Sequence, residues 1–364
     1  MAALLTERGA PRATMARMSR IAVVTSSPPM VEGGHMVIAR SLVQALRAAG
    51  HEAEVVVTPQ NRFGRQASAY LATWLTDVGS SGGQRIDQVI SLRYPSYAVR
   101  HPRHVCWLNH TMREYYDLWP RFEAGLSPQG RIKESVRRRL IHAADRYLLT
   151  RNVSRLFVQS RTIQQRLAMW PELKSTVLYP PPPPRDYRCD GYGDYIFMVS
   201  RLTPLKRADL LVRALATPDA SGVRAVIAGD GDDRARLVEL ARELRVSDRV
   251  TFTGVLTDGQ LIDHLAQCRA VCFPPVEEDY GFVTAEAFAS AKAVLTCHDS
   301  GGPVELVEDG VTGLVCEPSP EALGRALARV MIDRPLAETM GRAALQSAAR
   351  LRWADAVSAL TAID

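Results

Sequence analysis

Short apolar runs alternate along the chain with longer segments in which apolar residues recur at helical spacing. Residues 20–26 (RIAVVTS) form the first buried-strand pattern, and residues 35–50 follow as a helical pattern closed by a glycine. The same order returns from IDQVISL through HVCWLNH to RLFVQS. This alternation predicts an α/β fold in which a doubly wound parallel sheet carries helices on both faces.

Five consecutive prolines at residues 180–184 interrupt the alternation. Proline has no backbone N–H and favours a stiff, extended conformation, so the run marks a domain boundary. After it the alternation begins again, with strand patterns at YIFMVS, VRAVIAGDG, RVTFTG and AVLTC. The sequence therefore predicts a second doubly wound α/β domain.

We expect the chain to divide into four parts. A flexible tail (1–19) precedes a Rossmann-like N-terminal domain (20–184), and a Rossmann-like C-terminal domain (185–345) is followed by a helix (346–364) that packs back onto the first domain. Open α/β sheets bind ligands at the carboxyl ends of their strands. Two such domains should face each other across a cleft that holds the active site.

Composition excludes several classes of protein. Hydrophobic residues make up 46% of the chain and charged residues 23%, values typical of a globular protein rather than of a disordered or coiled-coil one. No apolar stretch reaches the 18 or so residues that a membrane-spanning helix needs, and no secretory signal is expected. The six cysteines include no C-x-x-C pair, which indicates neither a zinc site nor a disulfide framework. We expect a cytoplasmic protein.

The formal net charge of +6 is concentrated in one predicted helix. Residues 131–155 hold eight Lys or Arg against Glu134 and Asp145. We expect Arg137–Arg139 partly to face solvent and one apolar side to pack, formed by Ile132, Val136, Leu140, Ile141 and Ala144. The basic side is either a solvated helix face or a contact for an anionic partner, such as lipid headgroups at the inner face of the membrane or a phosphate-bearing substrate. Nucleic acid is not expected, because base-reading modules are missing from the sequence.

The segment SRLTPLKR (200–207) follows a strand pattern and opens a helix. Helix N-termini favour anions, so Arg201 and Lys206 together can clamp a diphosphate. The alternative is a pair of solvated surface cations.

The segment PPVEEDYGFVTAEAFASAKAV (274–294) carries two acidic residues eight positions apart, Glu278 and Glu286. A carboxylate can accept hydrogen bonds from the vicinal hydroxyls of a ribose, and Gly281 lets backbone amides approach a phosphate or sugar. The alternative is an acidic loop followed by an ordinary helix.

Two segments of the first domain add candidates. Gly33 and Gly34 lie at a strand-to-helix turn that admits a phosphate or sugar. His110 and Arg113 follow a strand end and should lie at the cleft edge, where a histidine can bond substrate. A lone histidine is more often structural, so this assignment depends on its position.

The ordered set of motifs resembles the retaining glycosyltransferases of family 4, also called group 1, which have the GT-B fold. It comprises the GG loop, H-x-x-R, S-R-L-x-P-x-K-R, A-G-D-G, F-T-G, E-D-Y-G-F-V-T-A-E-A and G-G-P-x-E-L-V. The chain departs from the common pattern at Ala291 and Ala293, where many members have Gly and Pro.

The resemblance implies a metal-independent hexosyltransferase with no cofactor, which moves a sugar from a nucleotide diphosphate donor to an acceptor hydroxyl with retention of configuration. The first domain would bind the acceptor and the second the donor. By position, the reaction would depend on His110, Arg201, Lys206 and Glu278. Arg113 would lie on the acceptor side. The residues implied to contact the donor are Gly33, Gly34, Arg201, Lys206, Gly254, Val255, Gly281, Phe282, Val283 and Glu286.

The resemblance favours GDP-mannose slightly over UDP-sugars, because the E-D-Y-G-F-V stretch is close to that of mannosyltransferases. The acceptor would be a glycan, a lipid-linked sugar or a small molecule. The alternatives are a nucleotide-sugar epimerase, a phosphorylase and a noncatalytic nucleotide-sugar-binding protein. A nicotinamide dehydrogenase fits poorly, because no G-x-G-x-x-G follows the first strand.

Overall fold

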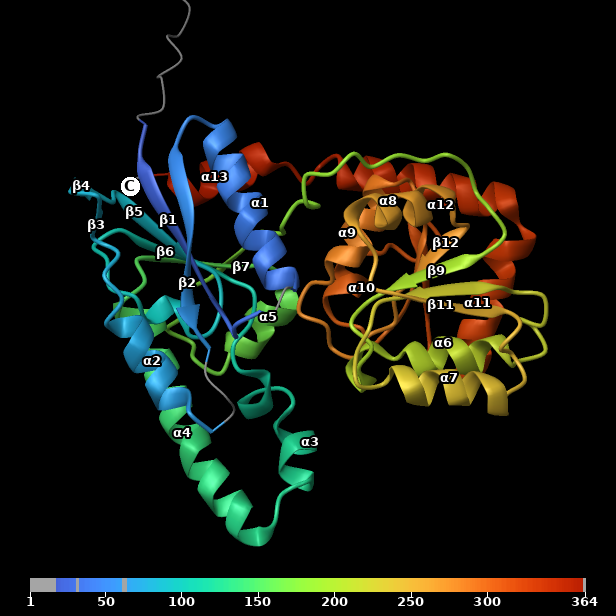
Figure 1. Cartoon of the computed structure of the whole chain (residues 1–364), viewed down its shortest axis with the longest axis horizontal. Helices are drawn as coiled ribbons and strands as arrows, with labels where there is room; N and C mark the ends of the chain where they lie inside the picture. Colours follow the sequence, from blue (N-terminus) through green and yellow to red (C-terminus); the bar gives the residue numbers. More distant parts are fainter. Residues whose placement is uncertain (1–17, 31–32, 61–63, 363–364) are drawn as a thin grey trace, which may run out of the picture.

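The computed structural model describes residues 18–30, 33–60 and 64–362 (Figure 1). Residues 1–17 of the expected flexible tail lie outside the described residues. The described chain forms two α/β lobes that lie side by side and are joined by an extended linker (Figure 1). The predicted fold class, two doubly wound parallel sheets, is confirmed.

The first lobe contains a parallel sheet of strand order β2-β1-β5-β6-β7-β8. Its strands are β1 (Arg20–Ser27), β2 (Glu52–Pro59), β5 (Gln88–Ser91), β6 (His104–Leu108), β7 (Arg155–Val158) and β8 (Thr176–Val177). Its helices are α1 (Gly34–Ala48), α2 (Gln66–Trp74), α3 (Trp119–Ala124), α4 (Pro128–Arg151) and α5 (Arg161–Leu167), with short 3₁₀ turns at Ser96–Ala98 and Arg113–Tyr115. A small hairpin, β3 (Ser80–Ser81) and β4 (Gln84–Arg85), lies outside the sheet.

The second lobe contains a parallel sheet of order β11-β10-β9-β12-β13-β14. Its strands are β9 (Ile196–Val199), β10 (Ala225–Ala228), β11 (Val250–Gly254), β12 (Ala270–Cys272), β13 (Val294–Cys297) and β14 (Gly313–Cys316). Its helices are α6 (Ala208–Leu215), α7 (Arg234–Glu243), α8 (Asp258–Gln267), α9 (Phe282–Ala289), α10 (Gly302–Leu306), α11 (Pro320–Ile332) and α12 (Arg334–Ala348), and Pro204–Lys206 forms a 3₁₀ turn.

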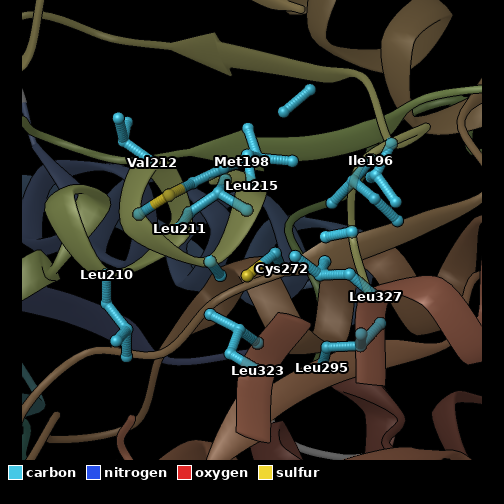
Figure 2. Close-up of a cluster of buried hydrophobic side chains, with 14 of the residues drawn as sticks. Ile196, Met198, Leu210, Leu211, Val212, Leu215, Cys272, Leu295, Leu323 and Leu327 are labelled. Carbon is cyan, nitrogen blue, oxygen red and sulfur yellow. The ribbon is translucent and has the colours of Figure 1, made fainter. Parts of the chain in front are cut away.

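The core of the second lobe follows from the two-residue period of its strands. Ile196 and Met198 of β9 point to one face of the sheet and pack with Leu211 of α6 and Leu327 of α11 (Figure 2). Phe197 points to the other face, where a separate cluster forms around α9. Because both faces of β9 are covered, all of these side chains are fully buried and the strand is apolar throughout.

The last helix, α13 (Trp353–Thr361), packs against α1 of the first lobe. The Gln88 side chain donates to the Leu360 carbonyl at 2.7 Å, and the Trp353 indole donates to the Pro182 carbonyl at 3.0 Å. The Trp353 ring also meets Trp107 edge-on, with centroids 6.2 Å apart. The first described strand, β1, and the last described helix, α13, therefore belong to the same lobe.

Helix α4 is rotated relative to our expectation. Of the residues predicted to pack, Ile141 is buried, but Ile132, Val136 and Leu140 are exposed by 71%, 52% and 67%. The side that packs instead includes buried Asp145, whose carboxylate accepts hydrogen bonds from Tyr97 at 2.5 Å and Tyr116 at 2.6 Å, as well as from Tyr70. A buried carboxylate must be hydrogen-bonded, and this requirement sets the orientation of the helix.

Candidate active site between the lobes

A cavity of about 600 Å³ is lined by residues of both lobes. Nine of the predicted site residues lie in its wall: Gly33, Gly34, His110, Arg201, Lys206, Glu278, Gly281, Phe282 and Val283. The structure thus brings together segments that lie up to about 250 positions apart in the sequence. Gly254, Val255, Glu286 and Arg113 are not part of this wall.

Two helix N-termini meet at the cavity. Gly34 begins α1 and Phe282 begins α9, and a Cβ atom added to Gly34 would lie 3.7 Å from the Phe282 ring. Neither helix has an acidic residue in its first turn. The N–H groups and dipoles of both helices therefore favour a negatively charged ligand between them.

Lys206 and Glu278 form an ion pair inside the cavity, with 2.5 Å between Nζ and Oε2. Both side chains are mostly buried, and the Lys206 ammonium also lies 5.6 Å from the centre of the Phe273 ring. Within the described part of the chain, the Arg201 side chain has neither a hydrogen bond nor an ion-pair partner. These side chains thus supply two positive charges, on Arg201 and Lys206, and one negative charge, on Glu278. An anionic ligand can bind both cations.

Close backbone packing fixes the position of Glu278. Its N–H donates to the Ser300 carbonyl at 3.0 Å, and its own carbonyl accepts from the Gly302 N–H at 2.9 Å. A Cβ on Gly301 would lie 2.5 Å from the Glu278 carbonyl oxygen, closer than any side chain tolerates. The G-G-P motif is therefore needed to hold the loop that carries Glu278.

Gly281 precedes α9 with φ near +80°, a conformation that glycine adopts readily. A Cβ at this position would lie 2.8 Å from the Phe273 ring. The glycine therefore lets the N-terminus of α9 reach the cavity without displacing the ring behind Lys206.

His110 is held as a neutral imidazole. Its Nδ1 lies 2.6 Å from the Thr111 carbonyl, which can only accept, so Nδ1 carries the hydrogen and Nε2 is an acceptor. Burial, together with the charge of Arg93, lowers the pKa of His110 to about 3 although Asp279 opposes the shift. His110 can therefore accept a hydrogen bond from a ligand hydroxyl.

This neutral state gives a pH prediction. The folded-state pKa lies below the ordinary value, so His110 stays uncharged from about pH 5 upward. We expect His110→Gln to lower kcat/KM by the same factor at pH 5.5 and at pH 8, as measured by initial rates of sugar transfer. A ratio of wild-type to variant rates that changes with a midpoint near pH 6.5 would show that the imidazole is charged in the cleft.

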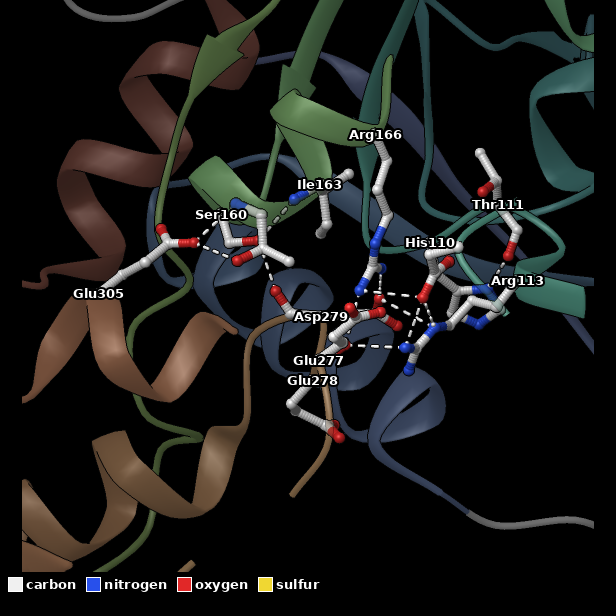
Figure 3. A network of polar contacts seen from close by, with 12 residues as sticks. His110, Thr111, Arg113, Ser160, Ile163, Arg166, Glu277, Glu278, Asp279 and Glu305 are labelled. Carbon is white, nitrogen blue, oxygen red and sulfur yellow. Dashed lines mark hydrogen bonds and ion pairs between the residues drawn. The ribbon is translucent and has the colours of Figure 1, made fainter. Parts of the chain in front are cut away.

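Arg113 lies outside the cavity and joins the two lobes (Figure 3). Its guanidinium donates to the Asp117 carboxylate at 2.6 Å and to the Glu277 carbonyl at 2.8 Å. The Asp279 carboxylate forms an ion pair with the Arg166 guanidinium and lies 3.7 Å from the Arg113 guanidinium. Burial alone would raise the pKa of Asp279, but these two charges outweigh it and hold the pKa below its ordinary value.

Glu305 forms a second contact between the lobes (Figure 3). Its carboxylate accepts the N–H groups of Arg161 at 2.7 Å and Thr162 at 2.6 Å, which begin α5, and the Tyr179 hydroxyl at 2.9 Å. An acidic side chain at a helix N-terminus satisfies otherwise free donors. Glu305 thereby attaches the first lobe to the loop that positions Glu278.

Glu286 is buried in the first turns of α9, beside the linker rather than in the cavity wall. It accepts hydrogen bonds from the Arg185 guanidinium and from the Tyr187 hydroxyl, the latter at 3.2 Å. Burial raises the pKa of Glu286 to about 7, against the opposing effect of Arg185 and Tyr187. Gly254 ends β11, and the adjoining Val255 is 78% exposed.

Sequence reasoning missed three charged residues near the site. Arg93 lines the cavity, Asp279 and Arg166 link the lobes, and none of them was a candidate. The available signal was position, since Arg93 directly follows the apolar run VISL, at a strand's carboxyl end. Among the residues that the structure covers, no group of three or more His, Cys, Asp or Glu could hold a metal ion.

Comparison with known sequences finds matches to the second lobe. Residues 186–347 match the model for glycosyl transferases group 1. The D-inositol 3-phosphate glycosyltransferase of Mycolicibacterium gilvum is 38% identical over 178 residues, which cover 47% of this chain and 39% of that protein. An alpha-1,3/1,6-mannosyltransferase of Homo sapiens is 31% identical over 137 residues, which cover 35% of this chain and 33% of that protein. The chain thus spans about two fifths or less of the length of these curated relatives.

Solved structures resemble nearly the whole chain. Sucrose-phosphate synthase from Thermosynechococcus elongatus superposes with a TM-score of 0.74 at 17% identity, covering 94% of this chain and 96% of that one. Anabaena HepE in complex with UDP and glucose superposes with a TM-score of 0.67 at 18% identity, covering 94% and 97%. These neighbours are GT-B glycosyltransferases, and at such identities the likeness establishes the fold. Residues 186–347 are therefore similar to the glycosyl transferases group 1, and the chain as a whole has the GT-B fold.

Proposed function

We propose that the protein is a retaining glycosyltransferase that moves a sugar from a nucleoside diphosphate donor to an acceptor hydroxyl without needing a metal ion. One observation carries the proposal: Arg201 and Lys206 of the second lobe share a cavity with His110 and the glycine turn of the first. The family of the second lobe and the complex of HepE with UDP-glucose support a nucleotide-sugar donor.

The cavity suits the chemistry of this transfer. The bond between the anomeric carbon and the diphosphate breaks through an oxocarbenium-like state, and negative charge grows on the leaving oxygen. Arg201 and Lys206 stabilise this charge, as does the N-terminus of α9. The acceptor oxygen bonds to the anomeric carbon from the side of the leaving group, and its proton passes to a diphosphate oxygen. His110 accepts a hydrogen bond from a sugar hydroxyl and holds the ring.

For the donor we propose a hexose nucleotide, with GDP-mannose ahead of UDP-sugars. The human relative named as a mannosyltransferase supports mannose, whereas HepE binds UDP-glucose at lower identity. Glu286 would bind the donor ribose, and its contact with Arg185 would then be exchanged for the two ribose hydroxyls. Gly254 and Val255 would border the base.

A donor panel tests the proposal. Purified protein is heated with UDP-, GDP- and ADP-sugars, and a donor present at 100 times its Kd should stabilise the fold by about 2.7 kcal/mol. The preferred donor, labelled in its sugar, is then incubated with candidate acceptors, and products are separated by mass. Transfer with retained anomeric configuration supports the proposal. Binding without turnover identifies a noncatalytic binding protein, and an isomerised free donor identifies an epimerase.

The exposed side of α4 supports contact with a membrane at its cytoplasmic face. Ile132, Val136 and Leu140 project from this helix, and a groove of about 760 Å³ separates it from α2. Cationic side chains at Arg131, Lys133 and Arg139 are exposed around the same turns. An apolar strip bordered by cations complements an anionic bilayer, so we propose this as the surface that approaches lipid-linked acceptors. No helix in the described ranges is long and apolar enough to cross a membrane.

Vesicle binding checks this surface. We expect the protein to sediment with vesicles containing anionic lipid and much less with neutral ones. Each Lys or Arg near an anionic surface contributes about 1 kcal/mol to the free energy of binding. Leu140→Glu should reduce the bound fraction at least fivefold. Leu345→Glu, at a partly exposed apolar residue of α12, is the matched control and should bind like the wild type. Equal binding of the two variants would contradict the assignment.

A further inference from the structure

Arg93 is a buried cation in the cavity wall. Arg93 lies two residues after the end of β5, at the carboxyl edge of the first sheet, and is only 7% exposed. Its Nε is fully buried without a hydrogen-bond partner, and in the described ranges its guanidinium forms no ion pair. The backbone beside it is fixed, because the Ser96 hydroxyl accepts from the Arg93 N–H at 3.1 Å and donates to its carbonyl at 2.6 Å.

The carboxylates near Arg93 are too distant or already engaged. Asp279 and Glu114 act on it electrostatically, but neither is in hydrogen-bond contact with it, and Asp279 is held by Arg113 and Arg166. Burial lowers the pKa of Arg93 to about 10, which leaves the side chain charged at neutral pH. Buried charges in proteins are normally paired. The missing partner of Arg93 therefore comes with a ligand.

The position of Arg93 indicates which ligand this is. Arg201 and Lys206, on the second lobe, already supply two cations for a diphosphate, whereas Arg93 lies on the first lobe with His110 and Gln60. The Gln60 amide oxygen is also buried without a partner among the described residues, and it can accept a hydroxyl hydrogen. A planar guanidinium matches the geometry of a phosphate or carboxylate.

We propose that Arg93 and Gln60 form an acceptor subsite that binds an anionic polyol, with Arg93 holding its phosphate or carboxylate group and Gln60 one of its hydroxyls. The inference rests on the proposed transferase function and adds the acceptor's chemical class to it. It predicts that acceptors bearing a negative charge are used in preference to their uncharged parents.

The first test measures binding and does not depend on turnover. Inorganic phosphate is titrated by calorimetry into protein saturated with the preferred nucleoside diphosphate, so that the diphosphate site is occupied. We expect Arg93→Gln to weaken phosphate binding at least tenfold, Arg93→Lys to weaken it less, and the nucleoside diphosphate Kd to stay within twofold. Arg103→Gln, an exposed residue of the same lobe, is the matched control and should behave as wild type.

The second test uses paired acceptors: glycerol 3-phosphate with glycerol, inositol 3-phosphate with inositol, and glucuronate with glucose. The phosphate pairs and the carboxylate pair identify the anion. We expect the charged member to be preferred in at least one pair, and Arg93→Gln to raise its KM at least tenfold with a smaller change in kcat. Gln60→Leu should raise the KM of both members of a pair.

Three results would overturn the inference. If Arg93→Gln weakens nucleoside diphosphate binding as Lys206→Ala does, Arg93 belongs to the donor site. If phosphate binding is unchanged while the melting temperature shifts, Arg93 is a structural cation. If uncharged acceptors are preferred, the acceptor class is wrong. A wild-type protein that binds phosphate through Arg93 but transfers no sugar would instead overturn the proposed function alone.

Discussion

Replacing Lys206 with alanine is expected to lower kcat for sugar transfer by about 10²- to 10³-fold, with a smaller change in donor KM. The Lys206 ammonium lies in the cavity wall. In the proposed reaction it faces the leaving diphosphate, which gains charge as its bond to the anomeric carbon breaks. Removing it also leaves Glu278, now 2.5 Å from Nζ, as an unpaired carboxylate facing that charge. Initial rates with the preferred donor, across a range of donor concentrations, separate kcat from KM.

Two further variants show whether the ammonium itself is responsible. Lys206→Arg keeps a cation and should recover part of the lost rate, whereas Lys174→Ala removes an exposed lysine of the first lobe and should leave the rate unchanged. A loss of less than tenfold in Lys206→Ala would mean that leaving-group stabilisation lies elsewhere. In that case Arg201 and the N-terminus of α9 would remain as its sources.

Replacing Asp145 with alanine is expected to destabilise the fold by about 3–5 kcal/mol, because each of three buried hydroxyls left without its acceptor costs about 1 kcal/mol or more. The Asp145 carboxylate is fully buried and accepts hydrogen bonds from Tyr70, Tyr97 and Tyr116, all of which would lose their partner. Asp145→Asn keeps an oxygen of the same shape and should cost much less. Urea unfolding of the three proteins measures these differences.

The same carboxyl group makes stability depend on pH. Burial raises the pKa of Asp145 to about 6, against the opposing tyrosine hydroxyls. Because the folded pKa lies above the unfolded value, this contribution to stability is present below about pH 4 and is lost as the pH rises through 6. We expect the wild type to lose stability relative to Asp145→Asn over this interval. Parallel stability curves for the two proteins would contradict the assignment.

The sequence predicted the fold and much of the cavity wall for a common physical reason. Residues such as Arg201 and His110 follow apolar strand patterns, and the carboxyl ends of parallel strands converge at one edge of a sheet. The strand pattern is local, so it can be read without knowing the tertiary structure. The strand pattern therefore predicted those site residues whose position depends mainly on a neighbouring strand.

The remaining features depend on contacts between distant segments. Arg113 donates to a carbonyl 164 positions away, and Arg166 pairs with Asp279 across 113 positions, which no local pattern encodes. The rotation of α4 depends on where three tyrosines from other elements place their hydroxyls. Arg93 was missed for a related reason, since only the completed cavity shows that it is buried without a partner.

The polypeptide crosses between the lobes twice, once after β8 and again between α12 and α13. The Trp353 indole ties the second crossing to the proline run of the first, so the two run as neighbouring spans. Two spans that are tied to each other restrain twisting of one lobe about the other, because such twisting would have to break the contact between Trp353 and Pro182.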